Sequence, residues 1–340
     1  MNIMRKSFII IITLFILTTF LFAKTYSSTQ PASVTINNIV FKEGLNENLV
    51  KKYFSTNEEA KKQAEKRIKE IVIKDLGYSD WTEYMDYIEI SLYPIDIIGD
   101  KKKELIIAVN LSKNLGTIAI YKTNNGGYEL ANKIENLTSI KGVSVKRNDT
   151  SDKRFLMVEE VLDESIGAYF TDNFIRLFTE IDNEFKEVFR ESLNYEAFYY
   201  EKWIDPSKEK PKWFKLNEKS VVDYTYNVDN HISLLVSKTI ERSEAKDNAD
   251  HTIPKKFKKV EEDFFEIKYI WSEKYSSFIL GEGEILSSKE EVGILEDTSK
   301  TADYLLKLGD KYYKVINKNM EIKYIKENEI KIIEDYSDKN

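Results

Sequence analysis

Residues 87–130 constrain the fold most, because they predict four short β-strands joined by three turns. β-Branched and aromatic residues dominate the predicted strands, which are 88–97, 105–109, 117–121 and 128–130. The turns between them contain glycine, asparagine and aspartate, which tolerate positive φ. We therefore expect a four-stranded antiparallel meander. Such a meander has two faces to cover and two edges to protect, so the rest of the chain should contain more of them.

The later sequence repeats this strand pattern twice. Further strands are predicted at 140–145, 155–161, 174–181 and 185–189, and then at 221–226, 231–240, 264–271 and 276–280. The charged segment 243–259 contains Pro254 and few apolar residues, which predicts a long exposed loop. The predicted fold class is mainly β, with antiparallel four-stranded meanders stacked as a small or incomplete propeller-like body over residues 84–285.

The N-terminal residues predict export. Arg5 and Lys6 precede an apolar run at 7–23, as in the charged and apolar regions of a signal peptide. The run is also close to the shortest length that spans a bilayer, so residues 1–23 are either a signal peptide or an N-terminal membrane anchor. We expect an exported protein that is extracellular or associated with the cell envelope, and that touches a membrane through this segment alone.

Two segments connect this region to the β body. Residues 24–55 predict a polar tether followed by an extended arm. Residues 56–77 predict one N-terminal helix, because Thr56 and Glu59 fit a capping box and Gly77 stands where a helix would end.

Composition excludes several classes of function. The chain has 340 residues and 42% hydrophobic residues, enough for a substantial core. It has no cysteine and only two histidines, His231 and His251, which excludes thiol chemistry, disulfides and multi-histidine metal centres. The net charge is -7, with 51 basic and 58 acidic residues interspersed, so we expect no nucleic-acid partner.

One turn of the first meander suggests both a family and a metal. Residues 96–105 have the sequence DIIGDKKKEL, which resembles the strand-turn-strand signature of FG-GAP or VCBS-type repeats in integrin-α-like propellers. The resemblance implies a propeller that recognises ligands outside the cell. Asp96, Asp100 and Glu104 are spaced to converge on calcium, but Ile98 replaces one carboxylate of the family pattern and Lys101 one glycine. The alternative is a plain β-turn with solvated charges and no cofactor.

The C-terminal segment 290–335 predicts a small β-barrel-like module. Its sequence GDKYYKV at 309–315, with Tyr324 and Ile325 further on, resembles bacterial SH3-like domains. In relatives such domains attach proteins to cell walls or peptides, and here that is an analogy. A final propeller blade and an unrelated β appendage are the alternatives.

Aromatic residues supply the candidate ligand-binding surface. The cluster lies on a proline-bounded loop and comprises Tyr199, Tyr200, Trp203, Trp213 and Phe214. Such side chains stack on sugar rings or receive a partner peptide, and the alternative is that they pack against the ends of the sheets.

These observations predict a non-catalytic recognition protein, with a protein or a cell-wall glycan as its ligand. The first alternative is a membrane-tethered accessory or structural subunit of an envelope complex. The second is a carbohydrate-active hydrolase, which needs two carboxylates across the scissile bond. No motif in the sequence singles out such a pair, so we assign no catalytic residue.

Overall fold

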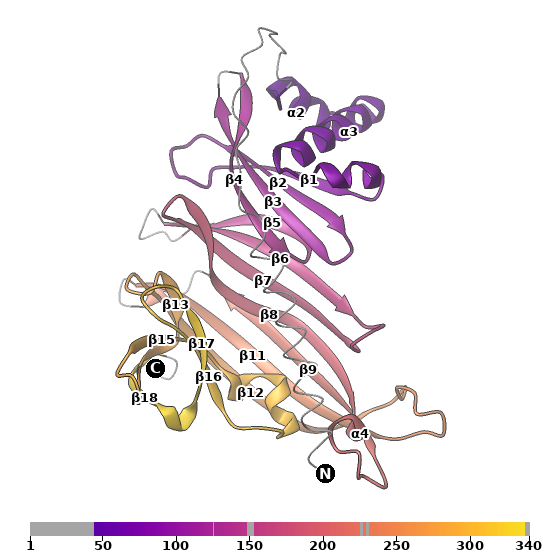
Figure 1. Cartoon of the computed structure of the whole chain (residues 1–340), viewed down its shortest axis with the longest axis vertical. Helices are drawn as coiled ribbons and strands as arrows, with labels where there is room; N and C mark the ends of the chain where they lie inside the picture. Colours follow the sequence, from indigo (N-terminus) through magenta and orange to yellow (C-terminus); the bar gives the residue numbers. More distant parts are fainter. Residues whose placement is uncertain (1–43, 125, 148–152, 225–226, 229–230, 337–340) are drawn as a thin grey trace. The chain divides into compact units, whose positions relative to one another are not determined.

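The computed structural model describes residues 44–124, 126–147, 153–224, 227–228 and 231–336 (Figure 1). The predicted signal peptide or anchor, 1–23, and the tether up to residue 43 lie outside the described residues. The predicted fold class is confirmed: the described chain is mainly β, with antiparallel sheets and few helices. None of the sheets closes on itself within the described part of the chain, so no closed propeller is present there.

The first sheet is the predicted meander. It has the strand order β1-β2-β3-β4, and its strands are β1 (Glu89–Ile95), β2 (Glu104–Ser112), β3 (Leu115–Asn124) and β4 (Gly127–Leu137). Nearly every residue of β2 is buried. Since successive side chains of a strand point to opposite faces, both faces of β2 are covered. Leu105 and Ile107 pack toward the helices, whereas Ile106 and Ala108 pack against residues of the second sheet, including Leu156.

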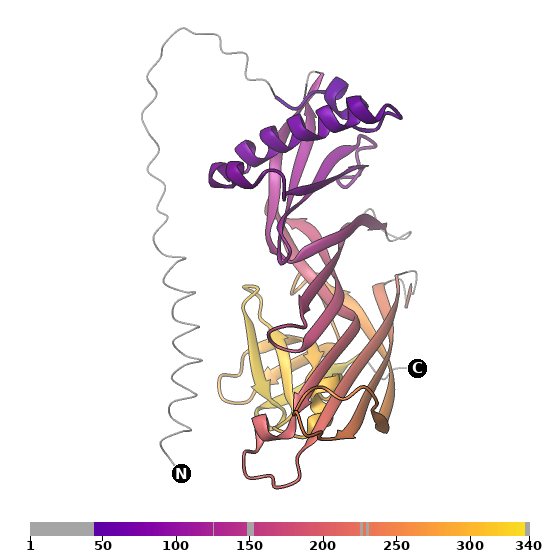
Figure 2. The same cartoon turned by 90° about the vertical axis from the view of Figure 1, so that its right-hand side faces the viewer.

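Two helices cover the other face of this sheet, α2 (Glu47–Tyr53) and α3 (Glu58–Asp75) (Figure 2). The predicted helix is confirmed as α3, although its N-cap is Asn57, which accepts a hydrogen bond from the Ala60 amide at 3.0 Å. The predicted extended arm is wrong for residues 47–53. The Asn46 side chain caps α2 by accepting a hydrogen bond from the Leu49 amide. This polar segment therefore forms a short helix, in which Val50 is the buried residue.

The second sheet contains eight strands in the order β13-β12-β11-β9-β8-β7-β6-β5, and the short β10 (Asn227–Val228) pairs with β11. Its strands are β5 (Ser139–Arg147), β6 (Arg154–Glu164), β7 (Phe170–Ile181), β8 (Glu184–Tyr200), β9 (Lys212–Asp223), β11 (His231–Lys246), β12 (Lys258–Ser272) and β13 (Ser277–Ile279).

Stacking of a second and a third four-stranded meander is a wrong prediction. β8 pairs with β9 over residues 194–200, so the two predicted groups form one continuous sheet. The error arose because β8 continues far beyond the predicted end at residue 189, and β9 begins well before the predicted start at residue 221. Some polar residues in these extensions, such as Arg190 and Lys219, are exposed, whereas Glu191, Glu218 and Ser220 are buried, so the polar sequence conceals real strands.

The predicted exposed loop at 243–259 is also too long. β11 continues to Lys246 and β12 begins at Lys258, so only 247–257 connects them. Charged residues pair across these strand ends, as Arg242 does with Glu261 at 3.2 Å. Their charge therefore belongs to paired strand ends and does not mark a loop.

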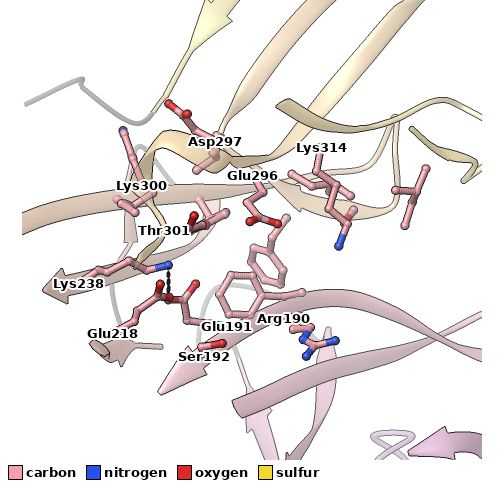
Figure 3. A pocket seen from close by; sticks show the side chains of 18 of the residues that line it. Arg190, Glu191, Ser192, Glu218, Lys238, Glu296, Asp297, Lys300, Thr301 and Lys314 are labelled. Carbon is pink, nitrogen blue, oxygen red and sulfur yellow. Dashed lines mark ion pairs between the residues drawn. The ribbon is translucent and has the colours of Figure 1, made fainter. Parts of the chain in front are cut away.

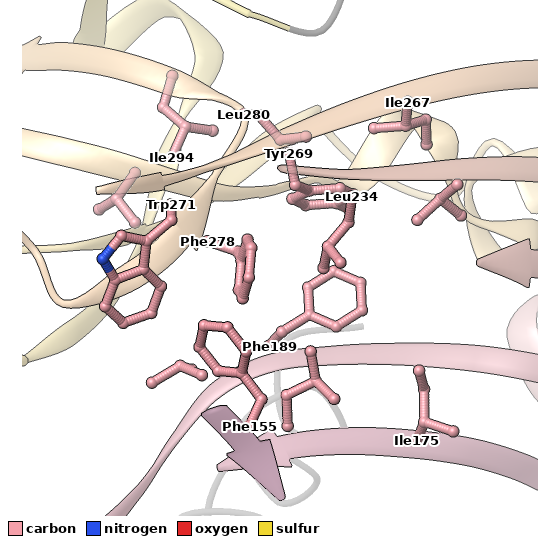
Figure 4. Close-up of a cluster of buried hydrophobic side chains, with 14 of the residues drawn as sticks. Phe155, Ile175, Phe189, Leu234, Ile267, Tyr269, Trp271, Phe278, Leu280 and Ile294 are labelled. Carbon is pink, nitrogen blue, oxygen red and sulfur yellow. The ribbon is translucent and has the colours of Figure 1, made fainter. Parts of the chain in front are cut away.

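The third sheet has the order β17-β16-β15-β14-β18. Its strands are β14 (Gly281–Ile285), β15 (Glu291–Asp297), β16 (Tyr312–Ile316), β17 (Ile322–Lys326) and β18 (Ile330–Asp335). β14 lies outside the predicted module at 290–335, yet it joins β15 to β18. This sheet shares one hydrophobic cluster with the second sheet (Figure 4), in which Phe189 and Phe278 pack with Val292 and Val315.

Candidate ligand pocket

A cavity of about 470 Å³ lies between the second sheet and the third sheet with its adjoining 3₁₀ turns (Figure 3). One wall is formed by strands β7, β8, β9, β11 and β12. The other wall is formed by β15, β16, β17 and the turns Thr298–Lys300 and Ala302–Leu306. Polar and apolar surfaces are mixed in this cavity, and many of the polar groups are ionisable.

Three buried charged residues on adjacent strands form what we call the buried charge cluster: Glu191, Glu218 and Lys238. The Lys238 Nζ lies 2.9 Å from Glu191 Oε1 and 2.9 Å from Glu218 Oε1 (Figure 3). Glu218 and Lys238 lie on one face of the paired strands β9 and β11, and Glu191 reaches them from β8, just before the stretch 194–200 in which β8 pairs with β9. One ammonium therefore bridges two carboxylates.

Both carboxylates of the buried charge cluster also accept further hydrogen bonds. The Ser220 hydroxyl donates to Glu191 Oε1 at 2.6 Å, and the Ala302 amide donates to Glu218 Oε2 at 3.0 Å. The second bond attaches the turn after β15 to the second sheet. Satisfying the remaining lone pairs is what makes a buried ion pair tolerable.

The electrostatics of the buried charge cluster follow from its burial. Burial raises the pKa of Glu191, and the attraction of Lys238 opposes that rise. Burial alone would lower the pKa of Lys238, but the two carboxylates outweigh it and hold the pKa above its usual value. Lys238 therefore stays charged at neutral pH.

Asp172, on β7, lines the same cavity and is 7% exposed. Its Oδ2 accepts a hydrogen bond from the Ser192 hydroxyl at 3.1 Å and lies 3.6 Å from the Arg190 guanidinium. Its buried Oδ1 has no hydrogen-bond partner among the described residues. Burial raises the pKa of Asp172. Buried polar atoms are almost always paired, so an unpaired one on a residue that lines a cavity suggests a site for a donor from outside the chain.

The opposite wall carries charged side chains without ion pairs among the described residues, namely Glu296, Lys300 and Lys314. Glu296 and Lys314 are opposite each other in the β15–β16 pairing. Figure 3 shows the Glu296 carboxylate and the Lys314 amino group directed into the cavity. The third sheet therefore presents groups of both signs to any ligand.

The structure brings three of the aromatic candidates together, because Tyr200, Trp203 and Trp213 are in mutual ring contact. Tyr200 and Trp213 are buried, at 7% and 2% exposed, with ring centroids 5.1 Å apart. Trp203 is 51% exposed and is therefore the most accessible of the five. One face of its ring stacks on Tyr169. Asp247 accepts hydrogen bonds from the Tyr200 hydroxyl and the Trp213 indole. These rings mainly close one end of the second sheet.

Tyr199 and Phe214 lie apart from those rings. Tyr199 packs with Leu305 of the C-terminal segment, and its hydroxyl lies 3.4 Å from Asp303. Phe214 lies under the guanidinium of Arg242, 5.8 Å from its ring centroid. The five predicted residues therefore do not form a single surface.

The three predicted calcium ligands have protein partners. Asp96 pairs with Arg154 at 2.7 Å and accepts a hydrogen bond from a backbone amide of the turn. Asp100 likewise accepts from a turn amide, and the buried Glu104 accepts from the Ile97 amide at 3.0 Å. Within the described ranges, no three acidic or histidine side chains are grouped so that they could hold a metal ion.

Sequence reasoning missed every charged residue of the cavity. One signal for Lys238 was present: it is in phase with Leu234, Val236 and Ile240, which are 3%, 0% and 0% exposed. A lysine on the apolar face of a strand must be paired or functional. No comparable signal marks Asp172.

Comparison with protein-family models, with curated proteins and with solved structures gives no match for this chain. None of the helices in the described part of the chain has the length and apolar character needed to cross a membrane.

Proposed function

We propose that this protein is an exported, non-catalytic binding protein of the cell envelope or the extracellular space, and that it holds a small ligand in the cavity between its second and third sheets. The unpaired, buried Asp172 Oδ1 is the observation that carries this proposal. The size of the cavity supports it, because small-molecule sites have volumes of about 300–1,000 Å³. The export component rests on Arg5, Lys6 and the apolar run at 7–23.

The contacts of the buried charge cluster support binding over catalysis. A glycosidase needs one carboxylic acid free to protonate the leaving group and a second carboxylate facing the sugar. Glu191 and Glu218 are instead bridged by Lys238 and accept hydrogen bonds from Ser220 and Ala302. Chromogenic glycosides test this part of the proposal, and turnover that is lost in Glu191→Gln would overturn it.

A variant that fills the cavity tests the binding proposal. No described residue forms an ion pair or hydrogen bond with Glu296, and its side chain points into the cavity, so Glu296→Trp fills the space without breaking a bond (Figure 3). Thermal shift assays would use a panel of sugars, free amino acids, dipeptides, polyamines and phosphate. We expect at least one compound to raise the Tm of the wild type and not that of the variant.

Two results would contradict the proposal. Either no compound of the panel raises the Tm, or the compounds that do so raise it equally in Glu296→Trp. The unliganded melting curve of the variant shows whether it has folded. Trp203→Ala is the matched comparison for a ligand that instead binds the accessible aromatic ring.

A membrane-tethered accessory subunit is the second candidate, and the length of the apolar run at 7–23 favours it. Fractionation of the producing cells into medium, wall and membrane separates the two. Protein of full length in the membrane fraction indicates a tether, and shortened protein in the medium indicates a removed signal peptide.

A further inference from the structure

We infer that the cavity binds a small zwitterion, a molecule with one ammonium and one carboxylate group such as a free amino acid or a dipeptide. This inference rests on the proposed function, because it names the ligand class of the same cavity. It is carried by Glu296 and Lys314, which have no ion pair among the described residues, and by the second carboxylate oxygen of Asp172, which accepts no hydrogen bond there.

Many of the charged side chains around the cavity already have protein partners. Its described lining has seven acidic and four basic side chains. Two of the acids pair with cations that are not part of the lining, Glu187 with Arg176 at 3.1 Å and Asp297 with Lys311 at 3.3 Å. The buried charge cluster pairs internally. The remaining charged groups nearly balance, so the cavity favours neither a strongly cationic nor a strongly anionic ligand.

Asp172 and Glu296 provide the acceptors for an ammonium group. The Asp172 Oδ1 is buried and without a partner, and Ser192 fixes the other oxygen through a 3.1 Å hydrogen bond. Glu296 lines the same cavity from the third sheet, and its carboxylate has no ion pair among the described residues. A hydrogen bond from an ammonium to a buried carboxylate is charge-assisted and therefore stronger than one from a neutral donor.

Lys314 and Arg190 provide the donors for a carboxylate group. Figure 3 shows the Lys314 amino group and the Arg190 guanidinium at one side of the cavity, with Glu191 and Glu218 at the other. Lys314 has no ion pair among the described residues, and Arg190 forms an ion pair with Asp172 at 3.6 Å that leaves its other donors available. A ligand carboxylate there would satisfy both cations.

Other ligand classes fit this arrangement less well. A polyamine would leave Lys314 without a counter-charge, and phosphate would leave Glu296 without one. A neutral sugar would bury all of these charged groups without compensation, which is costly in a partly dry cavity. The volume of about 470 Å³ accommodates an amino acid or a dipeptide.

Isothermal titration calorimetry on the full chain tests the inference. The probes are the twenty common amino acids and L-alanyl-L-alanine, each compared with its N-acetyl form, which lacks the ammonium, and its amide form, which lacks the carboxylate. We expect a zwitterionic probe to bind, and each blocked form to bind at least about ten-fold more weakly, since a lost charge-assisted hydrogen bond has this effect.

Two variants assign the two ends of the ligand. Asp172→Asn should lower the affinity for the zwitterion and for its amide form by about ten-fold, and it should leave the affinity for the N-acetyl form unchanged. Lys314→Gln should show the opposite pattern, weakening the zwitterion and the N-acetyl form. Asp80→Asn and Lys62→Gln remove the same charges from exposed positions outside the cavity and should change nothing.

Failure of this inference differs from failure of the proposed function. If glucose, putrescine or phosphate binds in the cavity and no zwitterion does, the ligand class is wrong while the binding function stands. If a zwitterion binds but the two variants do not give the crossed pattern, the assignment of the residues is wrong. If Glu296→Trp binds every probe as the wild type does, both proposals fail.

Discussion

Replacing Lys238 by methionine tests the electrostatic arrangement between the sheets. Lys238 is 6% exposed, and its ammonium is the cation that both Glu191 and Glu218 contact. Methionine keeps much of the apolar volume of the side chain and removes the charge. Removing one partner of a buried ion pair costs about 3–5 kcal/mol, because an uncompensated charge remains buried. We expect a loss of unfolding free energy in that range, well above the effect of a surface pair, which is at most about 1 kcal/mol.

Urea titration followed by tryptophan fluorescence measures this loss. For a cooperative unit of this size, a loss of 1 kcal/mol of unfolding free energy lowers the Tm by roughly 2 °C, so the Tm of Lys238→Met should fall by roughly 6–10 °C. Lys219→Met is the matched control. Lys219 follows Glu218 on β9, points to the opposite, exposed face of the sheet, and should change stability by less than about 0.5 kcal/mol.

The pH dependence of Lys238→Met has a definite sign. Burial already raises the pKa of Glu191 above its ordinary 4.5, and removal of the neighbouring ammonium raises it further. A carboxyl group whose pKa is higher in the folded state binds its proton more tightly there. The stability deficit of Lys238→Met relative to the wild type should therefore grow as the pH rises above 4.5, and it should shrink as the pH falls toward that value.

Two outcomes would refute this reasoning. The first is a Lys238→Met variant within about 1 kcal/mol of the wild type at neutral pH, which would mean that the carboxylates find other compensation. The second is a stability deficit that grows as the pH falls. Adding Glu191→Gln and Glu218→Gln to Lys238→Met removes both carboxylate charges and should restore most of the lost stability.

Three further predictions concern other parts of the chain. Trp213→Ala should destabilise the protein by about 3–5 kcal/mol in urea titrations because the ring is buried, whereas Trp203→Ala should cost less than about 1.5 kcal/mol; equal losses would contradict this. Gly281→Ala should lower the free energy of unfolding by about 1–3 kcal/mol, since its Cβ would overlap the Glu334 carbonyl oxygen of β18, and an unchanged Tm would be inconsistent with that pairing. The affinity for a zwitterion, measured by calorimetry, should fall at acidic pH as Asp172 becomes protonated. Burial raises the pKa of Asp172, and its charged neighbours include Arg190 and Glu218. If the same fall occurs in Asp172→Asn, a different group causes it.

The first sheet could be predicted because its turns are marked by residue type. Gly99 and Gly126 have φ of +99° and +89°, values that glycine adopts readily. α3 was predictable for a similar reason, since Gly77 adopts φ +79° where the helix ends. Local chemistry therefore fixes these elements without reference to distant parts of the chain.

The single second sheet could not be predicted in this way. The order of its strands depends on β8 pairing with β9, and the strands on either side of that junction resemble those of separate meanders. Charged residues such as Glu196 and Lys215 lie outside every predicted strand. In the structure they pair across the two strands at 2.5 Å, which stabilises the sheet on its exposed face.

The cavity was not predictable because no single segment contains it. Asp172 belongs to β7 and Glu296 to β15, and only the packing of the second sheet against the third brings both to one cavity. Charged residues on strands usually lie on an exposed face, so neither position differs from many others in the sequence. The aromatic candidates were conspicuous for the opposite reason, since large rings attract attention whether they bind a ligand or, like Trp213, close the end of a sheet.

The buried charge cluster links the stability of the protein to the formation of its cavity. Glu218 contacts Lys238 through one oxygen and the Ala302 amide through the other, so the same carboxylate neutralises a buried lysine and attaches the second wall. A protein needing only a stable core at this position could use apolar residues, which are often as stabilising as a buried ion pair. Charged groups at this position instead line a polar space between the two walls. This arrangement is more readily explained by a ligand that enters the cavity than by the requirements of folding.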